Sequence, residues 1–141
     1  MAKKKLQTEF GQTLLEFFER FSAWEQGVVA ESELSPAQMH ALEMLGHMRT
    51  PTMKELAQRL GVTTGTLTAM IDRLEKNALV ERKANPRDRR SFILTLTTAG
   101  QKQFAQHHLY HIQLTAELCA GFSEKEIRTF TEYLKKVIER I

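Results

Sequence analysis

The chain has 141 residues, of which 42% are hydrophobic, so it can bury a core and is not a disordered chain. Its net charge of +3 is modest, and its single cysteine, Cys119, excludes an intrachain disulfide and fits a reducing compartment. No apolar run is long enough to cross a bilayer, and no apolar segment follows the basic N-terminus. We therefore expect a cytoplasmic protein that does not enter a membrane.

The first predicted element is a helix over residues 6–28 with one broad apolar face. Its large apolar residues recur at steps of three and four, the spacing of one face of a helix. This is a large apolar surface for one helix of a small domain, so we expect it to be buried against a second subunit as well as its own core. The face consists of Phe10, Leu14, Phe17, Phe18, Phe21 and Trp24.

Three shorter helices follow, and their ends carry clear signals. Ser35 and Pro36 are an N-cap and a first helical residue, and Gly61 is a C-cap in the sequence. Thr63 or Thr64 is a suitable N-cap for the third of these helices. The three helices are predicted over residues 36–48, 53–60 and 64–77.

The hydrophobic period then changes to that of a β-hairpin. Residues 79–82 and 91–97 are predicted as strands, and the residues between them as a turn. This turn and the end of the first strand are strongly basic, with Asp88 as the only acidic residue within residues 82–90, which suits a polyanionic partner. The basic residues are Arg82, Lys83, Arg87, Arg89 and Arg90.

Two further helices complete the chain. A long helix is predicted over residues 98–119, and a capping box, Ser123-x-x-Glu126, opens a last helix over residues 124–141. The predicted fold class is therefore mainly α, in the order of four helices, a hairpin and two helices.

Two short helices with a tight connection, followed by a hairpin, form the order of a winged helix-turn-helix. The helix over 64–77 should place Leu67, Ile71 and Leu74 inward and enter the major groove of double-stranded DNA with its opposite face. Small and hydroxylated residues at its start would let the backbone approach phosphates and base edges. The predicted DNA-binding residues are Thr63, Thr64, Gly65, Thr66, Thr68, Ala69, Arg73 and Lys76 on this helix and Arg87, Arg89 and Arg90 on the hairpin.

Two other classes of function are weighed against DNA binding. The sequence contains no nucleophile elbow, phosphate-binding glycine loop or paired acids in a turn, so we do not expect an enzyme. A winged helix that serves only as a protein-interaction module is the other alternative, and the basic hairpin tip argues against it.

Five segments resemble motifs of the MarR family of transcription regulators, in the family's order and over nearly the whole chain. They run from Leu34 to Gln38, Leu56 to Thr68, Leu74 to Val80, Asp88 to Arg90, and Leu94 to Gly100.

The resemblance implies a homodimer built from the first helix and the last two. Residues 1–34 and 98–141 would then form the dimerisation region, and residues 35–97 the DNA-binding domain. It also implies that Arg90 enters the minor groove, with Asp88 orienting its guanidinium group. We expect a repressor whose DNA binding responds to an effector.

Four residues are candidate ligands for zinc as that effector. His107 and His111 lie four apart on a predicted helix, so both imidazoles project from one face. With His40 and Glu25 they would complete a tetrahedral site. In placement, this set resembles that of the zinc-sensing MarR regulators of lactic bacteria and streptococci. A small aromatic ligand between the dimer helices and the DNA-binding domain is the alternative effector.

Overall fold

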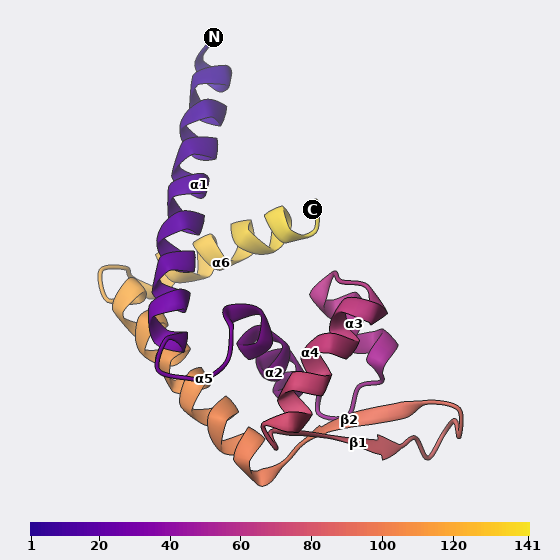
Figure 1. The fold of residues 1–141 in the computed structure, drawn as a ribbon. Coiled ribbons are helices and arrows are strands. Elements are labelled where there is room, and N and C mark those ends of the chain that lie inside the picture. Colours follow the sequence, from indigo (N-terminus) through magenta and orange to yellow (C-terminus); the bar gives the residue numbers. More distant parts are fainter. The chain divides into compact units, whose positions relative to one another are not determined.

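The computed structural model describes residues 1–141 and confirms a mainly helical fold with one antiparallel hairpin. The chain forms two compact units, Met1–Ala105 and Gln106–Ile141, so the boundary between them falls within one helix. In chain order the elements are α1 (Ala2–Val29), α2 (Pro36–Met48), α3 (Met53–Leu60), α4 (Thr64–Lys76), β1 (Val80–Ala84), β2 (Phe92–Leu96), α5 (Thr98–Cys119) and α6 (Glu124–Ile138) (Figure 1).

The predicted order of elements is confirmed, and the differences lie at element ends. α1 already begins at Ala2, because the alanine and lysines at its start are good helix formers. β1 begins at Val80 and not at Leu79, because the Leu79 amide still donates to the Leu74 carbonyl, 2.9 Å away, and so closes α4. The last helix ends at Ile138, three residues before the predicted end.

Side-chain caps fix where the short helices of the first unit begin. Ser35 and Thr52 each form a complete capping box, with Gln38 and Glu55 as the reciprocal partners, at the starts of α2 and α3. Gly61 ends α3 with a φ of 65°, the left-handed conformation that favours glycine. The predicted caps at Ser35 and Gly61 are therefore confirmed.

The core of the first unit lies where α2, α3, α4 and β2 meet. Each of these elements contributes leucine or isoleucine side chains that are fully withdrawn from solvent, and burial of such side chains is the main force that holds the elements together. The largest of them are Leu42 and Leu45 on α2, Leu56 on α3, Leu67, Ile71 and Leu74 on α4, and Leu94 on β2.

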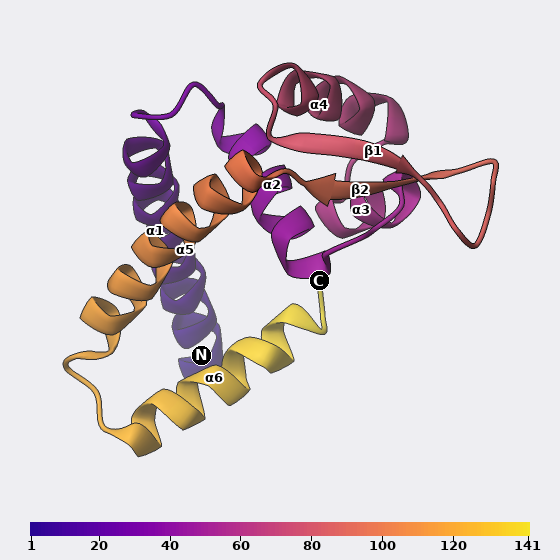
Figure 2. The same cartoon turned by 90° about the horizontal axis from the view of Figure 1, so that it is seen from below.

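The hairpin is anchored at its base and free at its tip. Val80 pairs with Leu96 and Ala84 with Phe92 at the two ends of the register. At the base, the Leu94 amide donates to the Pro51 carbonyl at 2.9 Å, and the Thr97 hydroxyl donates to the carbonyl of Ala78 at 2.6 Å. Beyond the strands the turn projects away from α2, α3 and α4, as both views show (Figures 1 and 2).

The second unit consists of the later part of α5 and all of α6. The predicted capping box is confirmed, since the Ser123 hydroxyl accepts from the Glu126 amide at 3.3 Å and the Glu126 carboxylate accepts from the Ser123 amide at 2.8 Å. Among the helices of the whole chain, none combines the length and apolar character that crossing a membrane would need.

Candidate nucleic-acid interface

The start of α4 is held by hydroxyl groups and remains open to solvent. The Thr63 hydroxyl caps the helix, accepting from the Thr66 amide at 3.1 Å and donating to the Thr66 hydroxyl at 3.0 Å. Thr68 donates to the Thr64 carbonyl at 2.8 Å. The amide groups of the first helical turn carry partial positive charge, so this end of α4 suits a phosphate oxygen.

The two faces of α4 divide as the sequence predicts. Leu67, Ile71 and Leu74 are fully buried, which turns the opposite face of the helix to solvent. An added side chain at Gly65 would meet nothing closer than the Thr63 hydroxyl at 3.9 Å, so the helix surface is flat there. All eight residues predicted to contact DNA from this helix are exposed, namely Thr63, Thr64, Gly65, Thr66, Thr68, Ala69, Arg73 and Lys76.

The turn of the hairpin is built by short side chains and exposes three arginines. The Asn85 side chain donates to the Ser91 hydroxyl at 2.8 Å and accepts from the Arg87 amide at 3.0 Å. These contacts shape the turn without involving any guanidinium group. Arg87, Arg89 and Arg90 are exposed and form no ion pair within the chain.

Asp88 contacts the backbone of Arg90 and not its guanidinium group, contrary to the expected role. Its carboxylate accepts from the Arg90 amide at 3.0 Å, and its carbonyl accepts from the Ser91 amide at 3.1 Å. Asp88 therefore shapes the turn that carries Arg90, and the arginine side chain stays available to a partner.

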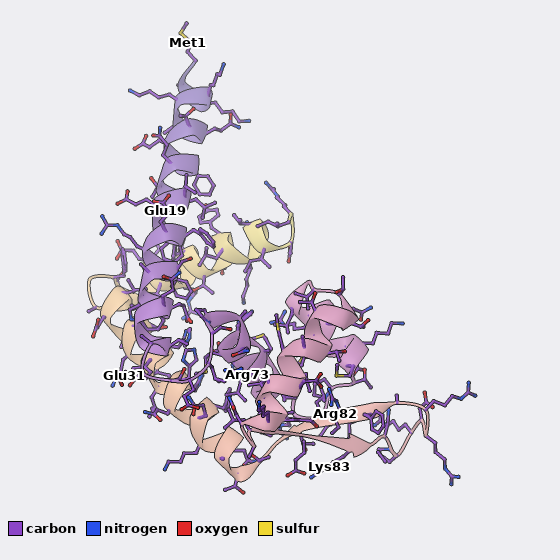
Figure 3. All side chains as sticks on the ribbon, in the orientation of Figure 1. Met1, Glu19, Glu31, Arg73, Arg82 and Lys83 are labelled. Carbon is purple, nitrogen blue, oxygen red and sulfur yellow. The ribbon has the colours of Figure 1, made fainter.

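Arg82 differs from the other basic residues of the hairpin, with which it was grouped in the sequence. Its guanidinium group lies 2.5 Å from the Glu75 carboxylate and 2.6 Å from that of Asp72, both on α4. Figure 3 shows Arg82 and Lys83 on β1 and Arg73 on α4. The statement that Asp88 alone offsets the basic cluster is therefore wrong. The two carboxylates were missed because they lie seven and ten residues away, on another element.

Two of the proposed zinc ligands, Glu25 on α1 and His40 on α2, belong to the first unit. The Nδ1 atom of His40 lies 4.0 Å from the Glu43 carboxylate. The neighbouring Glu43 carboxylate raises the pKa of His40 above 6.5, and the charge of Glu25 adds to this rise, whereas burial and Arg59 oppose it. Sequence reasoning missed Glu43, although its place three residues after His40 on a helix signals the contact.

The other two proposed ligands, His107 and His111, lie on α5 in the second unit. Their Nε2 atoms are 3.0 Å apart, so one ring donates to the other. This confirms that the two imidazoles project from one face of the helix, as their spacing predicts.

Comparison with known proteins identifies the family of the chain. The model of the MarR family matches residues 34–92, which include α2, α3, α4, β1 and the turn of the hairpin, up to the first residue of β2. The multiple antibiotic resistance protein MarR of Escherichia coli is 36% identical over 107 residues, which cover 75% of this chain and 74% of that protein. The chain belongs to the MarR family.

Two solved structures of proteins in complex with DNA resemble the chain over nearly its whole length. Streptococcus pneumoniae FabT in complex with DNA has a TM-score of 0.86 at 25% identity, covering 94% of each chain. A mutant of Escherichia coli MarR complexed with operator DNA has a TM-score of 0.75 at 30% identity, covering 92% of this chain and 93% of that one. The chain is thus a winged-helix transcription regulator of a DNA-binding family and not an enzyme, as predicted.

Proposed function

We propose that the chain is a sequence-specific repressor that binds double-stranded DNA as a homodimer. In this proposal α4 enters the major groove and the hairpin tip reaches the adjacent minor groove, with Arg90 inserted. The observation that carries the proposal is the set of three exposed arginines without ion pairs on a turn that projects from the same unit as α4. Cations that form no ion pair within the chain bind phosphates without first breaking an internal pair.

The surface of α4 supports its place in the groove. Gly65 and Ala69 have little or no side chain, so the helix backbone can approach base edges closely along this face. Arg73 and Lys76 follow one and two turns later, at the distance where a helix in the groove meets phosphates or further bases. Contacts from α4 would supply sequence preference, and contacts from the hairpin would supply most of the salt-dependent affinity.

The proposal is tested by measuring affinity for a genomic binding site at several salt concentrations. Arg90→Ala should weaken binding strongly. Arg87→Ala and Arg89→Ala should each weaken it, and should reduce the slope of log K against log salt by about one for each lost phosphate contact. Unchanged affinity and slope in all three variants would remove the hairpin from the interface.

Gly65→Leu tests the placement of α4 in the same assay. Because the space around Gly65 is open, the substitution should leave the fold intact and hold the helix away from the groove, so binding should be lost. Normal binding by Gly65→Leu would mean that another face of the protein meets DNA.

We propose zinc as the effector, with Glu25, His40, His107 and His111 as ligands. Tetrahedral zinc with Zn–N bonds of 2.0–2.1 Å holds two ligand nitrogens about 3.3 Å apart, close to the 3.0 Å between the Nε2 atoms of His107 and His111. Neutral imidazoles and a carboxylate are ligand types that zinc prefers. Bound zinc would favour the DNA-competent state by no more than its differential affinity for the two states.

Calorimetric titration of chelator-treated protein with zinc tests this part of the proposal. Binding tighter than micromolar is expected in the wild type, and His107→Ala and His111→Ala should each weaken it strongly. Gln113→Ala serves as the matched control, because Gln113 is an exposed residue of the same helix that offers neither an imidazole nor a carboxylate. Zinc binding that is indifferent to His107→Ala and His111→Ala would contradict the assignment.

A further inference from the structure

We propose that Arg82 is a positioning residue for DNA binding that masks the two carboxylates of α4. In this arrangement Arg82 does not contact DNA itself. By pairing with Asp72 and Glu75, it leaves Arg73 and Lys76 as the only unpaired charges that the helix presents to the phosphate backbone. The inference rests on the proposed function, in which α4 lies at the DNA.

The contacts of Arg82 occupy both ends of its guanidinium group. Nη1 donates to Glu75 Oε2 at 2.5 Å, and Nη2 donates to Asp72 Oδ1 at 2.6 Å. The other Glu75 oxygen, Oε1, accepts from the Arg82 backbone amide at 3.1 Å. Because both Nη atoms already bind carboxylates, a phosphate that reached the remaining N–H groups would lie next to two negative charges, so Arg82 is a poor phosphate ligand.

The charges of α4 show why the carboxylates need a partner. The helix carries Asp72, Arg73, Glu75 and Lys76, two acids and two bases, so its own side chains sum to zero. Arg82 from β1 adds one positive charge and pairs with both acids. Without it, Asp72, with 61% of its side chain exposed, would stand unpaired next to Arg73 on the proposed DNA-facing side. A free carboxylate there repels phosphates and cancels the effect of the neighbouring cation.

The exposure of the three side chains indicates that this role is not mainly one of folding. The Arg82 and Glu75 side chains are 28% and 30% exposed, and Asp72 is more exposed still. An ion pair with a largely exposed partner, such as the pair with Asp72, contributes little to the free energy of unfolding. Arg82→Ala should therefore leave a folded protein whose defect lies mainly in DNA binding.

The test combines loss of the arginine with neutralisation of the acids it masks. Arg82→Ala should weaken DNA binding about tenfold, equivalent to about 1.4 kcal/mol. Adding Asp72→Asn and Glu75→Gln should restore most of the affinity, together with the wild-type salt dependence. Asp72→Asn alone should restore the larger share, because Asp72 is the more exposed of the two acids. Lys83→Ala is the matched control on the same strand, since Lys83 pairs only with Glu81, at 3.5 Å.

Two other outcomes would overturn the inference. If Arg82 contacts a phosphate itself, the triple variant stays weak and its salt slope remains lower by about one. If Arg82 only holds the fold, the triple variant stays weak with a lowered melting temperature. Arg90→Ala separates this inference from the proposed function: its loss of binding should not be rescued by Asp72→Asn and Glu75→Gln. If Arg90→Ala and Gly65→Leu bind normally, the proposed function itself fails.

Discussion

Two residues other than glycine have a positive φ, and both lie where a helix of the first unit ends. Arg49, with φ 70° and ψ −68°, follows α2, and the Thr50 amide donates to the Met48 carbonyl at 3.0 Å across it. This is a γ-turn of the strained kind. Ala78, with φ 57°, follows α4. A side chain at such a φ brings Cβ close to the backbone, which glycine avoids.

Replacing either residue by glycine should therefore stabilise the protein. Arg49→Gly and Ala78→Gly should each raise the free energy of unfolding by about 0.5–1 kcal/mol, the relief of strain being partly offset by the greater freedom of the unfolded chain. Ala69→Gly, within regular α4, is the control and should lower it by about as much. Urea denaturation of the three variants measures the difference. A loss of stability in Arg49→Gly would mean that the turn is not strained.

The titration of His40 gives a second test at single residues. Glu43 and Glu25 hold the pKa of His40 above its unfolded value of 6.5, against the effects of burial and Arg59. The proton on His40 therefore stabilises the fold below about pH 6.5, and this contribution is lost as pH rises through the folded pKa. The proton on His40 competes with zinc. When the pH is lowered, zinc affinity should therefore start to decrease before pH 6.5 is reached, because the pKa of His40 is higher than 6.5.

Glu43→Gln should lower the pKa of His40, because it removes the carboxylate that contributes most to the raised pKa. Glu31→Gln, at a carboxylate that does not contribute to the rise, is the control. NMR titration of the imidazole protons in the metal-free protein measures both variants. A His40 pKa that does not move in Glu43→Gln would assign the shift to another group.

At the scale of elements, the sequence predicts best what short-range chemistry determines. Ser35, Thr52 and Ser123 cap helices within three residues of their partners, and each of these three helices begins directly after its cap. The buried and exposed faces of α4 likewise follow from its period. The partners of Arg82 could not be predicted, because Asp72 and Glu75 meet it only after α4 and β1 have packed.

The contact of Asp88 is a second feature that the sequence alone does not determine. An acid two residues before an arginine can bond to its side chain or to its backbone amide, and the sequence is the same in both cases. The tight turn from Asp88 to Ser91 favours the amide. The exposed arginine tip was thus predictable, whereas the way in which its turn is held was not.

Thr63 caps α4 and is also proposed to contact DNA, and substitutions can separate these two roles. Thr63→Ala should lower the free energy of unfolding by about 1 kcal/mol, because the Thr66 amide loses its partner. Thr63→Asp should preserve stability, since aspartate caps a helix as well as threonine, but should weaken DNA binding by placing a negative charge near phosphates. Thr63→Ser is the control for both. Wild-type DNA binding by Thr63→Asp would place this end of α4 away from the duplex.

At the scale of the whole molecule, each unit leaves large apolar side chains exposed. On α1, Phe10, Phe17 and Phe18 are all more than half exposed, and on α6 so are Phe130 and Ile138. Single exposed apolar residues are common, but repeated exposure along one helix is typical of a surface that a partner covers. A second copy of the chain would cover these helices and bring two DNA-binding domains into one particle, which would then favour operators with two half-sites.

We therefore expect a homodimer in which both ends of the chain lie in the interface. Phe18→Asp and Ile138→Asp should each shift the protein toward monomer, because a charge buried in an apolar interface has no partner. Gln12→Asp, on the opposite side of α1 from the apolar face, is the control and should leave the dimer intact. Sedimentation equilibrium at micromolar concentration measures the mass, and DNA binding should weaken together with dimerisation in the two interface variants. A stable, monodisperse monomer formed by the wild type under these conditions would contradict the proposed assembly and leave the apolar faces of α1 and α6 to another partner.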